Sequence, residues 1–143
     1  MKRLQIVMAL LLVLSSSVVE SETRMAIGAW SKHAPAIQNV QNENHELLAL
    51  EHNRWVIGHY KNSYSDSTVF VARNWRGPII EHVNWTLSLG VSRGYDRCWG
   101  FDKRDDPHFC PQGFVGVEYD RFRLVPTIKA SVGVIVFSPE IRF

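Results

Sequence analysis

The stretch from His82 to Tyr95 alternates between two kinds of side chain, and this alternation is the strongest constraint on the fold. One set is mostly large and apolar, and the other is small or polar. A repeat of two places the sets on opposite faces of a β-strand. Typical strands have only about 5–6 residues, so the pattern favours a narrow barrel in lipid, with apolar side chains outward and small ones toward the lumen. The apolar set is Val83, Trp85, Leu87, Leu89, Val91 and Tyr95, and the other set is His82, Asn84, Thr86, Ser88, Gly90, Ser92 and Gly94.

Similar segments recur along the chain and predict eight strands. Eight is the smallest usual number for a membrane barrel. In lipid a sheet must close on itself, because no water satisfies its edges. We therefore predict an all-β fold, an eight-stranded antiparallel up-and-down transmembrane β-barrel. The segments are Arg24 to Trp30, Glu46 to Glu51, Arg54 to Asn62, Ser67 to Trp75, Glu81 to Tyr95, Phe114 to Tyr119, Phe122 to Ala130 and Val132 to Phe143.

The links between these segments predict the orientation of the barrel. Short and long links alternate, apart from a short last link near Ala130 and Ser131. Short periplasmic turns and long external loops are typical of outer-membrane barrels. The short links are 52–53, 76–78 and 120–121, and the long links are 31–45, 61–66 and 96–113. This orientation predicts two aromatic girdles, with Trp30, Tyr60 and Tyr95 near the outer boundary and Trp55, Trp75, Tyr119 and Phe122 near the inner one.

The first residues have the order of a secretory signal. Two basic residues precede an apolar run from Leu4 to Leu14, and the small and polar stretch Ser15 to Ser21 follows. The apolar run is short of the ~20 residues that span a bilayer as a helix. We therefore predict a cleaved signal peptide, 1–21, and an exported barrel domain, 22–143, in a Gram-negative outer membrane.

Charge and cysteine content narrow the possible functions. The chain has 16 Lys and Arg against 14 Asp and Glu, a net charge of +2, which is too small and scattered to indicate a nucleic-acid surface. Cys98 and Cys110 lie in a polar stretch, and in an oxidising compartment such a pair predicts one loop-closing disulfide. The alternative is a metal site that adds His108 and an Asp, but these thiols lack the close spacing of zinc ligands.

The final segment resembles a signal for membrane assembly. It ends in Phe143, and apolar residues stand at alternate positions before it, namely Ile135, Phe137, Pro139 and Ile141. This spacing resembles the terminal signal that the outer-membrane assembly machinery recognises, so that machinery is an expected partner. Because proline removes a ladder donor, Pro126 and Pro139 predict local gaps in the barrel wall.

Two residues of the predicted external loops suit nucleophilic catalysis. His33 follows the first strand and Ser63 lies between the third and fourth, so both fall on the same rim. A hydroxyl is a weak nucleophile until a base takes its proton, and histidine suits that task near neutral pH. The alternative is a solvated loop histidine beside an ordinary turn serine. Other candidates are His45 and His59 near the same rim, His52 and His82 toward the periplasmic side, and the pair Asp66 and Ser67 in the same turn as Ser63.

Three segments, in order, resemble the PagP family, the outer-membrane lipid A palmitoyltransferases. Ala29 to His33, AWSKH, resembles the Trp-His at the end of the family's first strand. Gly58 to Tyr64, GHYKNSY, resembles its aromatic-Lys-Asp-Ser-Trp stretch. Val83 to Trp99 resembles its long fifth strand and the loop after it. The likeness covers about two thirds of the predicted exported domain, at low identity.

The resemblance implies an active site on the outer rim, where a His, an Asp and a Ser move an acyl chain from a phospholipid to lipid A. The His falls on His33, as base and acid, and the Ser on Ser63, as nucleophile or transition-state donor. The Asp falls on Asn62, which can orient a donor but cannot balance an imidazolium charge. Either activity is lower, or Asp66 substitutes, or the protein is no longer an enzyme. His33 also stands two residues later than the family pattern. Space for an acyl chain is expected at Ser88, Gly90, Ser92 and Gly94.

Three functions follow. The first is a PagP-like acyltransferase, a minimal version such as a phage carries, acting as a monomer on phospholipid and lipopolysaccharide with no metal or organic cofactor. The second is a non-enzymatic surface barrel that binds a partner or blocks a receptor. The third is a secreted lipocalin-like lipid binder, because Gly28-Ala29-Trp30 resembles the Gly-x-Trp of that family. The inward-facing polar residues argue against the third.

Overall fold

The computed structural model describes residues 22–35, 37, 40–98 and 103–143. The predicted signal peptide lies outside these residues. Within them, every regular element is a β-strand. The strands are β1 (Thr23–Ile27), β2 (Trp30–His33), β3 (Leu48–His52), β4 (Trp55–Lys61), β5 (Ser67–Ile80), β6 (Val83–Arg97), β7 (Lys103–Tyr119), β8 (Leu124–Ser131) and β9 (Val134–Arg142).

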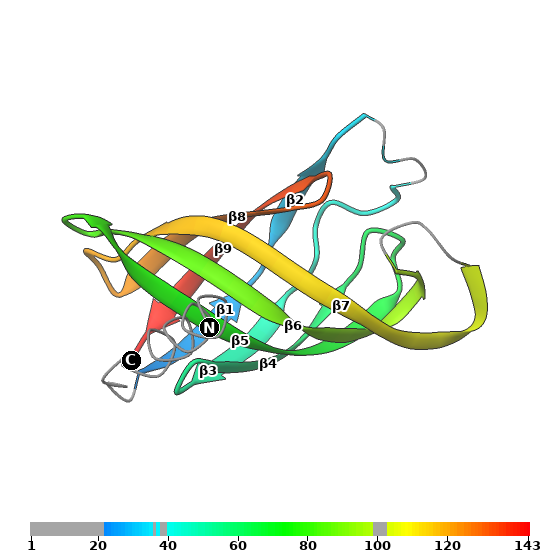
Figure 1. Ribbon diagram of the computed structural model, residues 1–143, viewed down its shortest axis with the longest axis horizontal. Coiled ribbons are helices and arrows are strands. Elements are labelled where there is room, and N and C mark those ends of the chain that lie inside the picture. The colour runs from blue at the N-terminus through cyan, green and yellow to red at the C-terminus, as the bar shows by residue number, and fades with distance from the viewer. Residues whose placement is uncertain (1–21, 36, 38–39, 99–102) are drawn as a thin grey trace, which may run out of the picture.

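The strands form one antiparallel sheet that closes on itself (Figure 1). β1 pairs with β3, each strand from β3 to β9 pairs with the next, and β9 pairs with both β1 and β2. β1 and β2 therefore share one position in the wall. They are separated at Gly28, whose φ of 83° lies in the left-handed region that glycine tolerates. The result is a closed barrel, which confirms the prediction of an all-β, antiparallel barrel of eight strands.

Two expected strand limits are wrong, although short turns and long connections do lie at opposite ends. The turn expected at 76–78 lies inside β5, which continues through Pro78 to Ile80 and ends in a register shift against β6. A proline is tolerated there because the ladder is already irregular. The loop expected at 96–113 is also too long, since β6 reaches Arg97 and β7 begins at Lys103. We call the end with the long connections the rim.

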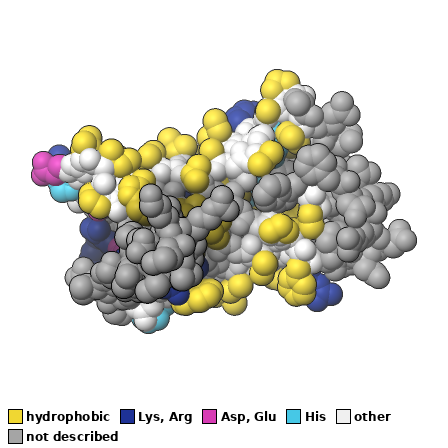
Figure 2. Space-filling model, in the orientation of Figure 1, with side chains coloured by type: hydrophobic (Ala, Val, Ile, Leu, Met, Phe, Trp, Pro, Cys, Tyr) yellow, Lys and Arg dark blue, Asp and Glu magenta, His cyan; other side chains and the backbone are white. Residues whose placement is uncertain are grey.

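The two faces of the wall differ as the alternation predicts. In β6, Trp85, Leu89 and Val91 are exposed, whereas Thr86 and Ser92 are buried. Figure 2 shows apolar side chains spread along the wall. Soluble monomers rarely expose so much contiguous apolar surface. Exposed large apolar residues from all parts of the barrel include Ile27, Leu48, Leu50, Trp55, Ile57, Val69, Val71, Val115, Val117, Leu124, Ile128 and Ile135.

Two of the predicted girdle residues point into the lumen instead. The hydroxyls of Tyr60 and Tyr95 lie 3.0 Å apart inside the barrel. Tyr60 is on the same face of β4 as buried Val56, and Tyr95 is turned inward at a register shift beside Gly94, which has a φ of 132°. Trp30 does face outward, where it stacks on Phe137.

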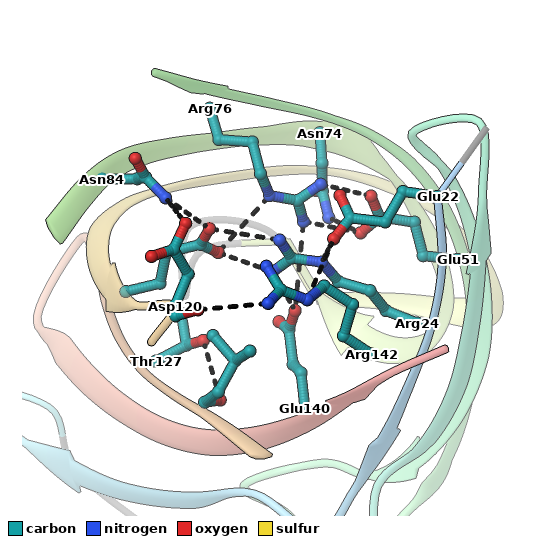
Figure 3. A network of polar contacts seen from close by, with 12 residues as sticks. Glu22, Arg24, Glu51, Asn74, Arg76, Asn84, Asp120, Thr127, Glu140 and Arg142 are labelled. Carbon is teal, nitrogen blue, oxygen red and sulfur yellow. Dashed lines mark hydrogen bonds and ion pairs between the residues drawn. The ribbon is translucent and has the colours of Figure 1, made fainter. Parts of the chain in front are cut away.

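Six charged side chains meet inside the barrel near the end with the short turns, and Figure 3 labels four of them. We call them the ion-pair layer: Arg24, Glu51, Arg76, Glu118, Lys129 and Glu140, from β1, β3, β5, β7, β8 and β9. Arg24 Nη1 lies 2.8 Å from Glu118 Oε2, Arg76 Nη2 lies 2.8 Å from Glu51 Oε2, and Lys129 Nζ lies 2.9 Å from Glu140 Oε1. Three cations face three anions, so the buried charges compensate one another.

Candidate functional site

His33 and Ser63 meet at the rim. His33 is the last residue of β2, and Ser63 lies in the turn between β4 and β5. Closure of the barrel brings them together, with His33 Nε2 2.9 Å from Ser63 Oγ. This is hydrogen-bond distance, so the hydroxyl can donate to Nε2 when that nitrogen is unprotonated. The two residues nominated from the sequence thus form a His-Ser pair.

Asn62 holds the turn that presents Ser63. Its side chain is fully buried. Oδ1 accepts hydrogen bonds from the backbone N–H groups of Tyr64, at 2.9 Å, and Asp66, at 3.0 Å. Nδ2 donates to the carbonyl of Gly94, at 3.0 Å, and to Thr68 Oγ1, at 3.1 Å. All four hydrogen bonds fix the turn, as asparagine often does, and none reaches His33. An orienting role for Asn62 toward His33 stays a prediction.

The second ring nitrogen of His33 has no partner among the described residues. Nδ1 is buried and makes no hydrogen bond, whereas in a Ser-His-Asp triad a carboxylate holds this atom. Asp66 is exposed and does not supply it. At the rim, burial and then the nearby His45 lower the pKa of His33. The neutral ring, which can accept the Ser63 proton, therefore predominates at neutral pH.

A second His-Ser pair lies beside the first. His45 Nδ1 is 2.7 Å from the carbonyl of Lys61, and His45 Nε2 is 2.7 Å from Ser31 Oγ. Because a carbonyl only accepts, Nδ1 carries a proton, and in the neutral ring Nε2 accepts from Ser31. Both residues are buried, and the pair fastens the long first connection to the barrel. Our sequence reasoning kept His45 open but missed Ser31, although Ser31 stands two residues before His33 and hence on the same face.

The remaining histidine candidates lie away from Ser63. His59 Nε2 is 2.6 Å from Ser67 Oγ, but this pair is exposed on the outer side of the wall. His52 bonds to Thr23 at the opposite end, and His82 lies in the turn before β6. His52 and His82 therefore lie at the end of the barrel away from Ser63, as expected.

A cavity of about 170 Å³ runs from His33 and Ser63 into the lumen. We call it the deep cavity. Its walls are largely apolar, and its floor is formed by members of the ion-pair layer. Of the four positions expected to leave acyl space, only Ser88 lines it. Gly90 instead permits close approach of β5, since a β-carbon there would lie 2.6 Å from that of Ala72. The apolar lining includes Ala49, Val56, Phe70, Phe114, Val134 and Val136.

A second cavity, of about 160 Å³, also begins at His33 and Ser63. We call it the rim cavity. Ser92 and the disulfide between Cys98 and Cys110 contribute to its wall. The disulfide confirms the predicted pairing, and the alternative metal site is wrong because both thiols are consumed. In the described part of the chain, no group of three or more His, Cys, Asp or Glu residues is placed to hold a metal ion.

Comparisons with known proteins give no family. No model of a known protein family matches the chain, and no curated protein matches it. Among the residues that the structure describes, no helix is long and apolar enough to cross a membrane. The inference about function therefore depends on the barrel, the His-Ser pair and the two cavities.

Proposed function

We propose that this protein is an acyltransferase of the Gram-negative outer membrane, which moves a fatty acyl chain from a phospholipid to lipid A, as the likeness to the PagP family suggests. The observation that carries the proposal is the hydrogen bond between His33 and Ser63 at the mouth of the deep cavity. An activated hydroxyl beside a largely apolar cavity suits a reaction on a long-chain ester.

The exposed apolar wall supports the membrane location. Large apolar side chains facing outward on neighbouring strands are the surface that a barrel presents to lipid. With Trp30 at the outer boundary, His33 lies beyond the membrane and the ion-pair layer lies toward the periplasm. A closed barrel in the membrane fraction should migrate differently on a gel before and after heating. Recovery of the protein as a soluble periplasmic monomer would contradict the location.

The reaction divides into two steps that use protein groups alone. In the first, Ser63 Oγ passes its proton to His33 Nε2 and attacks the acyl carbonyl carbon of the phospholipid. The ester C–O bond breaks, and the glycerol oxygen takes the proton from His33, which releases a lysophospholipid. In the second, a lipid A hydroxyl passes its proton to His33 and attacks the acyl-Ser63 ester, and Ser63 leaves with that proton. Each step starts with the neutral ring of His33, which takes a proton, and ends when the protonated ring gives that proton to the leaving oxygen.

Substitution of either member of the pair tests the proposal. His33→Ala and Ser63→Ala should each abolish acyl addition to lipid A, measured by mass spectrometry of lipid A, while the heat-dependent gel shift persists. The double variant should be no worse than the weaker single, because neither group acts alone. Ser67→Ala is the matched control, since that serine bonds to His59 on the outside of the wall. Transfer that survives both alanine substitutions would refute the site.

The unpartnered Nδ1 of His33 favours one other candidate. A histidine that no carboxylate holds is a weaker base than a triad histidine. The lack of a carboxylate partner at His33 Nδ1 fits a non-enzymatic barrel whose external loops bind a partner and catalyse no reaction. Mass spectrometry of lipid A separates the two functions, because even the wild-type protein would add no acyl chain to lipid A if it were only a binding barrel.

A further inference from the structure

The two cavities meet at the His-Ser pair but lead in different directions. The deep cavity descends to the ion-pair layer, and the rim cavity opens beneath the disulfide and the β8–β9 hairpin. An acyl-transfer site must hold two substrates on either side of the reacting carbonyl. Two cavities that join at the reacting groups provide such an arrangement. The residues common to both are His33, Ser63, Tyr95, Gln112, Phe114 and Val134.

The linings of the two cavities differ in charge. The deep cavity includes Arg24, Glu51, Lys129 and Glu140 at its floor. The described lining of the rim cavity has no Lys, Arg, Asp or Glu. Besides His33, its polar groups are hydroxyls and the Gln112 amide, and the rest of its lining is apolar or aromatic, including Ile37, Val132 and Val134. Those hydroxyls and rings belong to Ser63, Ser92, Ser131, Tyr64 and Tyr95.

This lining suits an uncharged ligand that presents both hydroxyl groups and apolar faces. A phosphate placed in the rim cavity would meet no described cation, and an uncompensated buried charge is costly. A sugar ring presents hydroxyls for hydrogen bonding and flat C–H faces for packing on aromatic rings. Tyr64 and Tyr95 stand nearly perpendicular, at 88°, with centroids 6.5 Å apart, and so form two sides of a corner.

We propose that the rim cavity is the acceptor subsite, which holds an uncharged, hydroxyl-bearing part of the lipid A sugar beside Ser63. This inference rests on the proposed acyltransferase function. The donor chain occupies the deep cavity, and the donor phosphate stays outside the rim cavity. The bound acceptor hydroxyl passes its proton to His33 Nε2 as its oxygen bonds to the acyl carbon. The bond from that carbon to Ser63 Oγ breaks, and Oγ takes the proton back.

The experiment blocks the rim cavity and leaves the His-Ser pair in place. Ser131 faces the rim cavity from β8, and its neighbour Ala130 pairs with outward-facing Ile135 and Val115. Ser131→Phe therefore places a ring in the cavity, and Ala130→Phe places the same ring in lipid as the matched control. Tyr64→Leu removes an aromatic wall without adding bulk. Transfer to lipid A and hydrolysis by water are measured together in micelles with an acyl-labelled phospholipid.

Loss of the acceptor subsite should change the ratio of the two products. In Ser131→Phe and Tyr64→Leu the ratio of transfer to hydrolysis should fall at least about tenfold, because a displaced acceptor loses its alignment while water does not need it. Ala130→Phe should keep the wild-type ratio. If the Ser131→Phe barrel does not assemble, the product ratio of Tyr64→Leu alone tests the acceptor subsite. An unchanged ratio in the assembled cavity variants, or an equal fall in Ala130→Phe, would overturn the subsite. A wild type with neither transfer nor hydrolysis would overturn the proposed function as well.

Discussion

Asn62 takes the position at which the resembling family carries an aspartate, and its contacts explain why an amide suits this chain. A carboxylate only accepts hydrogen bonds, whereas Asn62 accepts two and donates two. The two donated bonds tie the turn of Ser63 to Gly94 on β6 and to Thr68 on β5. Sequence comparison with the family could suggest the role of position 62, but the direction of its side chain depends on how the turn closes.

Asn62→Asp should weaken the turn and should not accelerate acyl transfer. The carboxylate would face the Gly94 carbonyl without a proton to donate, and leaving such buried groups unsatisfied costs about 1–3 kcal/mol. The measurement is the temperature at which the folded gel band disappears, taken with the transfer rate. Asp66→Asn is the control, because only the backbone of Asp66 bonds to Asn62. A faster rate with unchanged stability would support the orienting role for position 62 instead.

The pH dependence of transfer should report His33. Burial and the nearby His45 lower its pKa below the ordinary value of 6.5, and the base form exists above the pKa. The rate should therefore be level above neutral pH and should fall only as the pH drops through a midpoint below 6.5. Initial rates of transfer in buffers of constant ionic strength measure this midpoint. A midpoint above 6.5 would mean that another group limits the reaction.

At the scale of elements, period-two alternation predicted the wall and failed where the ladder is irregular. It correctly predicted that the barrel has eight strand positions, and it predicted which side chains of β6 face outward. It placed Tyr95 outward because it continued unbroken past the register shift near Gly94. The fourth predicted strand ended at Trp75, yet β5 continues through Pro78, where the irregular pairing with β6 accommodates the proline. Such shifts depend on pairing with a neighbouring strand, which the local sequence does not contain.

The Cys98–Cys110 disulfide joins the residue after β6 to the inside of β7, where Cys110 pairs with Ser92 of β6, so its removal should act within this hairpin. Replacing both cysteines with serine should leave the barrel assembled and gel-shifted. The cross-link closes a loop with a sequence separation of 12, for which chain entropy predicts about 3 kcal/mol. Limited proteolysis on intact cells should therefore cut the β6–β7 connection faster in the double variant. Failure of the barrel to assemble would show that the disulfide acts beyond this hairpin.

At the scale of the whole molecule, the ion-pair layer separates the deep cavity from the opposite mouth of the barrel. Its members come from six strands and contact one another across the lumen, so no local pattern in the sequence predicts these contacts. Arg24 and Glu118 are 94 residues apart. Their meeting depends on the closure and stagger of the barrel. The layer fixes the floor of the deep cavity and closes the lumen with balanced charge.

Glu118→Gln should destabilise the barrel far more than the loss of a surface ion pair. Glu118 accepts hydrogen bonds from Arg24, Arg76 and Asn84, so neutralising it leaves two buried cations with too little negative charge. Breaking a buried pair from one side costs about 3–5 kcal/mol. Glu46→Gln is the control, because Glu46 pairs with Lys61 on the exposed surface, where such pairs contribute at most about 1 kcal/mol. Urea unfolding in detergent micelles, followed by tryptophan fluorescence, gives both free energies. Equal losses in the two variants would mean that water reaches the layer and screens its charges, and the deep cavity would then have no closed floor.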